Sequence, residues 1–229
     1  MKDAPLSPSS ERVGATNDIS TRTIGEAWLD LAEKILNEGH SGKYDGLVIR
    51  ELIMPILLVS DPSSDDSLIQ RFADPTRLEW MHANFTDFTR VAALGGAESY
   101  ATRLYDYDHQ GINQIEWVIE RLKSDPSSRS ATITTFQPLT DTTYIPCVSL
   151  LDFFILGEGL CLVVYAHSID FGTKGFANLV ELAYLQEHVA TALATEIGHL
   201  TFIVKSAHIY ESEFCEMSEL LKVANDARR

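Results

Sequence analysis

Positive charge is scarce in this sequence. Its 18 Lys and Arg residues stand against 33 Asp and Glu residues, which gives a formal net charge of −15 at pH 7. A nucleic-acid surface needs clustered basic residues to neutralise phosphates, so this composition argues against DNA or RNA as a partner. A small anionic ligand is still allowed, because it needs only a few local positive groups.

Cysteine and long apolar runs are also sparse. The three cysteines, Cys147, Cys161 and Cys215, are widely spaced and odd in number, which is more typical of a reducing compartment than of a disulfide framework. No apolar run reaches the roughly 18 residues of a membrane span, and the first residues lack the basic and apolar regions of a signal peptide. We therefore expect a cytoplasmic protein without a membrane partner.

Motifs for metals and phosphates are missing as well. The sequence has no Gly-rich phosphate loop, no serine-centred nucleophile elbow, and no metal-ligand spacing among its cysteines and seven histidines. What remains is the composition of an ordinary globular protein, with 45% hydrophobic and 22% charged residues over 229 positions. We expect one domain with a full core and no bound metal.

The first residues differ in composition from the rest of the chain. Met1 to Ser20 is rich in Ser, Pro, Asp and Asn without periodicity, which predicts a disordered arm over residues 1–22. The domain is then expected to cover residues 23–229. It would begin at Thr23-Ile24-Gly25-Glu26, a capping box in which the Thr23 hydroxyl and the Glu26 carboxylate accept hydrogen bonds from free helix amides.

Helical patterns dominate the first half. Four apolar residues recur at helical spacing before Gly39, which ends the predicted helix: Ile24, Trp28, Leu31 and Ile35. Further helices are expected over residues 78–94 and 112–122. The apolar run 47–60 contains one acid, Glu51. Its simplest interpretation is a solvated helix position, and the alternative is a proton shuttle with a raised pKa.

The second half has strand patterns around one long apolar segment. Short segments rich in Val, Ile, Thr and aromatic residues predict strands over 131–136, 148–156, 161–166 and 201–205, with a hairpin turn at Gly157-Glu158-Gly159. The segment Phe176 to Glu196 is apolar nearly all round, which predicts a buried helix. Helices followed by strands around a buried helix predict an α+β domain, with a mixed sheet packed on that helix.

Besides Glu51, two residues could carry chemistry, although each has a simpler explanation. Cysteine is among the most buried residue types, so Cys147 beside Pro146 would most often be inert packing. As a nucleophile it must ionise, which requires a nearby cation or base such as His167 or Arg129. His208 between two apolar residues would most often be a satisfied core histidine.

Six ordered segments resemble the thymidylate synthase family, in particular its compact archaeal type. They are Tyr100-Ala101-Thr102-Arg103-Leu104 (Tyr-Gly-x-Arg-Leu in the family), Asp125-Pro126-Ser127-Ser128-Arg129 (Pro-x-Ser-Arg-Arg), Pro146-Cys147, Ser168-x-Asp170, Asn178 and Ser206-Ala207-His208-Ile209-Tyr210. Several ordered matches over more than a hundred residues are far more specific than any one alone. The resemblance implies a thymidylate synthase-like fold that dimerises through its sheet, with active sites shared between two copies.

The resemblance also implies a role for each site residue. Cys147 would add to carbon-6 of a pyrimidine nucleotide, Glu51 would move protons through water, and Tyr100 would complete the catalytic set. The implied substrate-binding residues are Arg129, His167, Ser168, Asn178, His208 and Tyr210. The implied contacts of methylene-tetrahydrofolate, the one-carbon donor, are Asp170 and Gly172.

Three departures from the family concern positive charge. The family's Arg-Arg is Arg129-Ser130 here, the arginine before Ser-x-Asp is His167, and no arginine stands in the loop Ser41-Gly42-Lys43-Tyr44-Asp45-Gly46. Losing two charge-assisted phosphate contacts would cost about 3 to 6 kcal/mol. Residues 223–229 also lack a counterpart of the family's tail, which closes over folate.

These departures predict an unusual substrate or a compensating cation. Lys43, Lys174 or His167 could supply the charge, and a protonated His167 could replace the arginine that steadies the thiolate. We expect an enzyme that methylates or hydroxymethylates carbon-5 of a non-standard pyrimidine nucleotide. The alternatives are an ordinary thymidylate synthase acting on dUMP and an inactive pyrimidine-binding protein. A binding protein would need Asn178 but not Cys147.

Overall fold

The computed structural model describes residues 17–44, 46–142 and 144–228. Its helices are α1 (Ile24–Glu38), α2 (Ser67–Phe72), α3 (Pro75–Thr86), α4 (Tyr100–Tyr105), α5 (Gln114–Ser124), α6 (Gly175–Leu193) and α7 (Phe214–Ala227), with 3-10 turns η1 (Ala92–Leu94) and η2 (Glu211–Glu213). Its strands are β1 (Ile19–Thr21), β2 (His40–Tyr44), β3 (Leu47–Ile53), β4 (Ile56–Val59), β5 (Ala131–Thr134), β6 (Val148–Leu156), β7 (Gly159–Ala166), β8 (Ile169–Asp170), β9 (Glu196–Val204) and β10 (Ser206–Tyr210).

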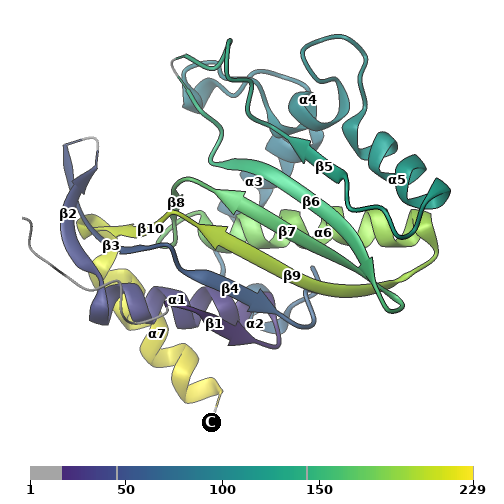
Figure 1. The fold of residues 1–229 in the computed structure, drawn as a ribbon. Coiled ribbons are helices and arrows are strands. Elements are labelled where there is room, and N and C mark those ends of the chain that lie inside the picture. Colours follow the sequence, from purple (N-terminus) through teal and green to yellow (C-terminus); the bar gives the residue numbers. More distant parts are fainter. Residues whose placement is uncertain (1–16, 45, 143, 229) are drawn as a thin grey trace, which may run out of the picture.

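The strands form two mixed sheets. The larger sheet has the order β1-β4-β9-β7-β6-β5, and the smaller has the order β2-β3-β10-β8. Within the larger sheet the β1–β4 and β7–β9 pairs are parallel, while the other neighbours are antiparallel. Figure 1 shows α6 behind the strands of the larger sheet, and the opposite face of these strands in front. The α+β class expected from the sequence is confirmed.

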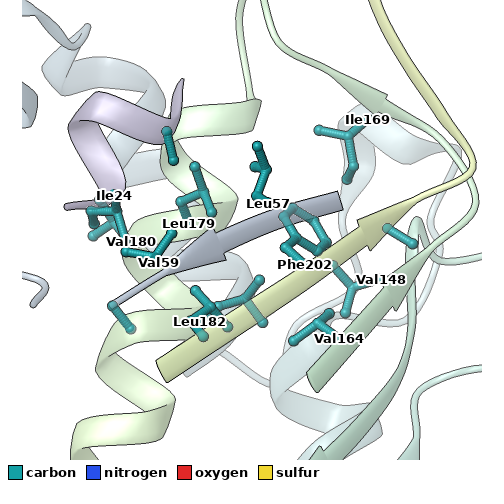
Figure 2. Packing of buried hydrophobic residues seen from close by; sticks show 14 of the residues in the cluster. Ile24, Leu57, Val59, Val148, Val164, Ile169, Leu179, Val180, Leu182 and Phe202 are labelled. Atoms are coloured by element: carbon teal, nitrogen blue, oxygen red, sulfur yellow. The ribbon is translucent and has the colours of Figure 1, made fainter. Parts of the chain in front are cut away.

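Helix α6 forms the centre of the core. Most of its residues from Gly175 to Ala190 are buried, as its nearly uniform apolar sequence predicts. Leu179 and Leu182 of α6 lie beside Leu57 of β4 and Phe202 of β9 in Figure 2, and all four side chains are completely buried. The polar Gln186 is tolerated inside because its Nε2 donates to the carbonyl oxygens of Leu160 (2.8 Å) and Gly198 (3.1 Å).

The start of the domain follows its local signals. The Thr23 hydroxyl accepts a hydrogen bond from the Glu26 amide at 3.3 Å, and the Glu26 carboxylate accepts one from the Thr23 amide at 3.2 Å. The α1 helix ends where Gly39 donates its amide hydrogen to the Ile35 carbonyl oxygen. Both the capping box and the helix end are therefore confirmed, because they depend on neighbours within the same few residues.

Regular secondary structure begins within the segment 1–22, which the sequence predicts to be a disordered arm. Residues 1–16 of that arm lie outside the described part. Ile19–Thr21, however, forms β1 and pairs in parallel with Leu57, Leu58 and Val59 of β4. The expected boundary after residue 22 is therefore wrong for β1. Pairing with a distant strand decides the conformation of this polar segment, and its composition does not reveal that pairing.

The apolar run around Glu51 is not a helix. The strands β2, β3 and β4 occupy His40–Tyr44, Leu47–Ile53 and Ile56–Val59, so the helical interpretation of Glu51 is wrong. The segment is rich in Val and Ile, whose branched side chains favour strands. Short apolar runs fit buried strands and buried helices equally well until their partners are known.

Other boundaries moved by a few residues. The helix expected over 78–94 is α3, which starts at Pro75 because Asp74 caps it, and which ends at Thr86. The helix expected over 112–122 is α5, at 114–124. The predicted strands correspond to β5, β6, β7 and β9, and Gly157 has a φ of 63° in the β6–β7 turn, which favours glycine. The sequence patterns did not predict α7.

Candidate active site

A cavity of about 210 Å³ lies where the two sheets meet α3, α4 and α6. Its lining residues are Tyr44, Trp80, Met81, Asn84, Leu94, Tyr100, Tyr144, Cys147, Ser168, Ile169, Asp170, Lys174, Asn178, His208 and Tyr210. Seven of the predicted site residues therefore share one cavity: Cys147, Tyr100, Ser168, Asp170, Asn178, His208 and Tyr210. They come from positions more than a hundred residues apart in the sequence.

Cys147 stands at the entrance to strand β6. The preceding Pro146 is buried, and the Cys147 carbonyl oxygen accepts a hydrogen bond from the His167 amide at 3.0 Å. Cys147 as a residue is partly buried, and it lines the cavity. Burial raises the pKa of Cys147 most, while the charge of Lys174 and a hydrogen bond with Tyr144 lower it. The thiol is thus reachable, and its ionisation depends on its immediate neighbours.

Tyr100 lies next to this thiol. Its ring packs on Phe85, with centroids 4.5 Å apart, and its hydroxyl oxygen accepts a hydrogen bond from the Val148 amide at 2.9 Å. Burial raises the pKa of Tyr100 well above its ordinary value, and the nearby Cys147 raises it further. Tyr100 is therefore a protonated phenol at neutral pH, and it can donate its own proton in a hydrogen bond.

A tight turn places the residues at the start of α6. The Asp170 carboxylate accepts hydrogen bonds from the Gly172 amide (2.9 Å) and from the Thr173 hydroxyl. One turn into the helix, the Asn178 side-chain amide donates to the Lys174 carbonyl oxygen at 2.9 Å. Asn178 can still donate a second hydrogen bond and accept through Oδ1, a combination that suits the edge of a pyrimidine base.

His208 carries an unsatisfied polar atom into the cavity. The residue is 3% exposed, and its Nδ1 lies 3.5 Å from the Ser168 hydroxyl. Its Nε2 is buried and has no hydrogen-bond partner among the described residues. A buried nitrogen without a partner costs stability, so native proteins seldom keep one without a functional reason. The cavity therefore has the character of a site that a polar ligand completes.

Four predicted site residues do not line this cavity. Glu51 lies on β3 opposite His208 of β10, and its carboxylate accepts a hydrogen bond from the Ser206 hydroxyl at 2.7 Å. Arg129 lies exposed between α5 and β5. Gly172 lines a separate hollow with Trp28 and Phe176. None of these three residues is among those that line the cavity within one copy of the chain.

His167 is the fourth of these residues. Its Nδ1 lies 3.5 Å from the Ser149 hydroxyl, and burial together with the charge of Lys205 lowers its pKa. This shift disfavours the protonated form that His167 would need in order to steady a thiolate. Among the cations considered to replace the missing arginines, Lys174 lines the cavity, whereas Lys43 is exposed on β2 and does not.

Several lining residues were not expected. Trp80 and Asn84 are one turn apart on α3, and the Trp80 ring lies 6.0 Å from the Lys174 ammonium. Tyr44 packs against His208, with ring centroids 5.5 Å apart. The sequence offers one indication for Tyr144, which stands three residues before Cys147. It offers no indication for Trp80, Asn84 or Tyr44, since only long-range packing brings α3 and β2 to the cavity.

Acidification should lower the folding stability of the protein through the buried His208. Burial lowers its pKa from 6.5, although Asp170 and Glu51 oppose that shift. As the pH falls through 6.5, the unfolded chain binds a proton at this histidine more readily than the folded chain does, so stability falls as the pH falls. Urea unfolding at pH 7.5 and 5.5 should show a smaller loss for His208→Phe than for the wild type. The exposed His199→Gln serves as the control, and an equal loss in all three proteins would contradict this explanation.

Among the described residues, no group of three or more His, Cys, Asp and Glu side chains could hold a metal ion. In the described part of the chain, no helix combines the length and the apolar character needed to cross a membrane.

Comparison with known proteins identifies relatives of this chain. The family model for thymidylate synthase matches residues 65–228. A candidate thymidylate synthase of Methanothermobacter marburgensis is 34% identical over 223 residues, which cover 90% of this chain and 98% of that protein. One of Methanothermobacter thermautotrophicus is 31% identical, with 89% and 98% covered. A bifunctional dihydrofolate reductase-thymidylate synthase of Paramecium tetraurelia is 28% identical over 47% of this chain and 24% of its own length.

The mixed α+β domain places a cysteine, a tyrosine and an asparagine in one cavity, a set of side chains that can serve covalent catalysis. The match over most of its length shows that the chain belongs to the thymidylate synthase family. The family transfers one-carbon units to pyrimidine nucleotides and uses methylene-tetrahydrofolate as co-substrate, and membership indicates an enzyme of this methyltransferase type.

Proposed function

We propose that this protein adds a one-carbon group to carbon-5 of a pyrimidine nucleotide through a covalent bond between Cys147 and carbon-6. The observation that carries the proposal is the shared cavity of Cys147 and Asn178. A nucleophile and a base-reading amide in one small cavity suit covalent attack on a pyrimidine ring. A protein that only bound pyrimidines would not need the nucleophile Cys147.

The residues of the cavity suit the proposed reactants. The enclosed part, about 210 Å³, is smaller than the roughly 300 Å³ at which sites for drug-sized ligands begin, and it suits one pyrimidine ring and part of its sugar. Methylene-tetrahydrofolate would supply the one-carbon unit and would have to extend beyond this space. The aromatic face of Trp80 and the Asp170 carboxylate at the wall are suitable contacts for a ring with amino and amide groups.

Each side chain then has a distinct task. Asn178 donates to and accepts from the edge of the base, while the unpartnered His208 Nε2 and the neighbouring Tyr210 hydrogen-bond the sugar. Tyr100, held protonated by burial, donates a hydrogen bond at the reacting ring. Ser168 holds His208 in place at 3.5 Å. Glu51 acts on the site through its neighbours Ser206 and His208, since it does not reach the cavity itself.

The charges of the cavity favour a non-standard substrate. Lys174 is the one Lys or Arg among the described lining residues, and Asp170 offsets its charge. The dianionic phosphate of dUMP would need more positive charge than this wall offers. We therefore favour a nucleotide that differs from dUMP in its phosphate or sugar, with either a methyl or a hydroxymethyl product.

A second copy of the chain would bring the missing arginine. The face of the larger sheet opposite α6 carries an apolar row across four strands: Ile56, Ile203, Tyr165 and Leu150, which are neighbours in register. Leu150 is 37% exposed, and Leu58 on the same side of β4 is 41% exposed. An apolar sheet face normally packs against another layer. We propose that two copies pack through this face and that Arg129 of one serves the cavity of the other.

The proposed dimer predicts a large effect of one charge. Ile203→Glu on β9 would place a carboxylate at the centre of the apolar row, twice in a symmetric interface. We expect the dissociation constant of the dimer to increase by about a hundred-fold or more, because a charge desolvated in the interface costs several kcal/mol. Sedimentation velocity over a concentration series measures the change. Leu139→Glu, at a side chain that is 93% exposed, is the matched control, and a monomeric wild type would contradict the dimer.

The reaction itself is tested by the release of tritium. A pyrimidine nucleotide labelled at carbon-5 should lose its label when methylene-tetrahydrofolate is present, since the new bond at carbon-5 displaces that hydrogen. Mass spectrometry of the products from a mixed nucleotide pool identifies the substrate and the added group. If no uracil or cytosine nucleotide releases tritium, the proposed function is wrong and the pyrimidine-binding alternative is favoured.

A further inference from the structure

We propose that Tyr144 and Lys174 are the two residues that promote ionisation of Cys147 and hold its thiolate, in the place of the arginine that stands before Ser168 in the family. The proposal rests on the proposed function, because only a nucleophilic Cys147 needs to be ionised. It assigns a catalytic task to Tyr144, which contacts the reacting sulfur, and an electrostatic task to Lys174.

Tyr144 reaches the sulfur from the same stretch of chain. It stands three residues before Cys147 in the segment that leads into β6, both side chains line the same cavity, and hydrogen bonding by Tyr144 lowers the pKa of Cys147. Burial raises the pKa of Tyr144, and the neighbouring Cys147 raises it further, so its hydroxyl keeps its proton at neutral pH. A protonated phenol can donate to a thiolate, which favours the ionised sulfur over the neutral one.

Lys174 supplies the positive charge from the start of α6. It precedes the first residue of α6, and its backbone amide donates to the Asp170 carbonyl oxygen at 3.1 Å. Its ammonium group lies 6.0 Å from the centre of the Trp80 ring, which restrains it in the cavity that Cys147 lines. The positive end of the α6 dipole points to the same region. Among the charges that act on the thiol, that of Lys174 has the largest favourable effect.

Two other residues near Cys147 titrate or carry charge, His167 and Asp170. His167 lies beside Ser149, and its lowered pKa leaves it neutral, so it does not supply the charge. Asp170 disfavours the thiolate, but its oxygens already accept hydrogen bonds from Gly172 and Thr173. Burial outweighs the favourable neighbours in the free protein, so the thiolate is a minor species that depends on these two residues.

The ionising step is simple in atoms and charge. The S–H bond of Cys147 breaks, its proton passes to solvent, and the electron pair stays on Sγ. Tyr144 keeps its own O–H bond and directs that hydrogen at the sulfur, while Lys174 remains an ammonium ion. The electron pair on Sγ is then available to form the bond to carbon-6 of the substrate.

The test is the pH dependence of Cys147 alkylation in the free, full-length protein. Iodoacetamide labelling is followed by peptide mass spectrometry in a Cys215→Ala background, because Cys215 is exposed and would also react. We expect the midpoint of the labelling profile to rise by about one pH unit in Tyr144→Phe and again in Lys174→Met. Lys174→Arg keeps the charge and should stay near the starting midpoint.

Two control variants separate this effect from general ones. Tyr184→Phe removes a hydroxyl from the outer side of α6, and Lys123→Met removes a charge from the exposed side of α5, so neither should move the midpoint. Unmoved midpoints in both Tyr144→Phe and Lys174→Met would overturn the proposal. Equal shifts in Lys174→Arg and Lys174→Met would overturn the task of Lys174. Tyr144→Phe keeps the ring and decides the outcome if Lys174→Met unfolds.

The test is also independent of the proposed reaction. Alkylation needs neither nucleotide nor folate, whereas release of tritium needs both. A shifted midpoint without tritium release would leave the activation of Cys147 standing and reject the proposed function. Tritium release with unshifted midpoints would support the proposed function and reject the roles of Tyr144 and Lys174 in the ionisation of Cys147.

Discussion

Replacement of Cys147 by alanine is expected to lower tritium release from carbon-5 by about a thousand-fold or more. Without the sulfur no bond forms at carbon-6, so carbon-5 does not become nucleophilic, and loss of a covalent nucleophile has effects of this size or larger. The side chain is only partly buried, so its removal should leave folding nearly intact. The measurement is the initial rate of tritium release at saturating nucleotide and co-substrate.

Cys215→Ala is the matched control for that result. Cys215 is an exposed residue on α7 and does not line the cavity, so its loss should leave the rate within about two-fold of the wild type. Binding of nucleotide to Cys147→Ala, measured by calorimetry, should persist because Asn178 and His208 are unchanged. If Cys147→Ala retained most of its activity, the covalent mechanism would be wrong.

Replacement of Arg103 by methionine is expected to destabilise the protein by about 3 to 5 kcal/mol. The Arg103 guanidinium makes two hydrogen bonds to the Asp141 carboxylate, at 2.7 and 2.8 Å, and a third to the Thr135 carbonyl oxygen at 2.7 Å. The two side chains are only 4% and 7% exposed. Methionine would leave the Asp141 charge buried without its partner. The drop in the urea midpoint at pH 7.5 measures the loss.

A double variant shows whether the lost partner is the cause. Arg103→Met with Asp141→Leu removes both charges, and we expect it to recover most of the lost stability, since apolar replacements of a buried ion pair are often neutral. The exposed pair Arg22–Asp61 is the control: Arg22→Met should cost less than about 1 kcal/mol. A double variant no more stable than Arg103→Met alone would show that packing, and not charge, dominates.

This ion pair also explains a residue that belongs to the family resemblance. Arg103 stands in the segment Tyr100 to Leu104, and the sequence offers no sign of its partner 38 positions away. Through Asp141, which also accepts a hydrogen bond from the Gln137 amide at 2.8 Å, Arg103 holds the segment that precedes Tyr144 and Cys147. Its loss should therefore reduce activity as well as stability.

Local signals predicted the parts of the fold that depend on neighbours in the chain. The capping box at Thr23, the end of α1 at Gly39 and the buried character of α6 are examples. The segment around Glu51 shows the limit of prediction from local signals. Its apolar surroundings suit a helix or a strand, and the pairing of β3 with β10, which is more than 150 residues away, decides between them.

The sequence by itself determined the family and singled out Cys147 as the candidate nucleophile and Asn178 as the candidate reader of the base, because each is recognisable from residue identity and order along the chain. Only the tertiary structure decided that Tyr144 and Lys174 line the same cavity as Cys147, that the His167 ring lies beside Ser149, and that Glu51 is not among the residues that line the cavity. The physical reason is that these positions follow from which strands pair and how helices pack on them. Those contacts link distant segments, and no periodicity within either segment records them.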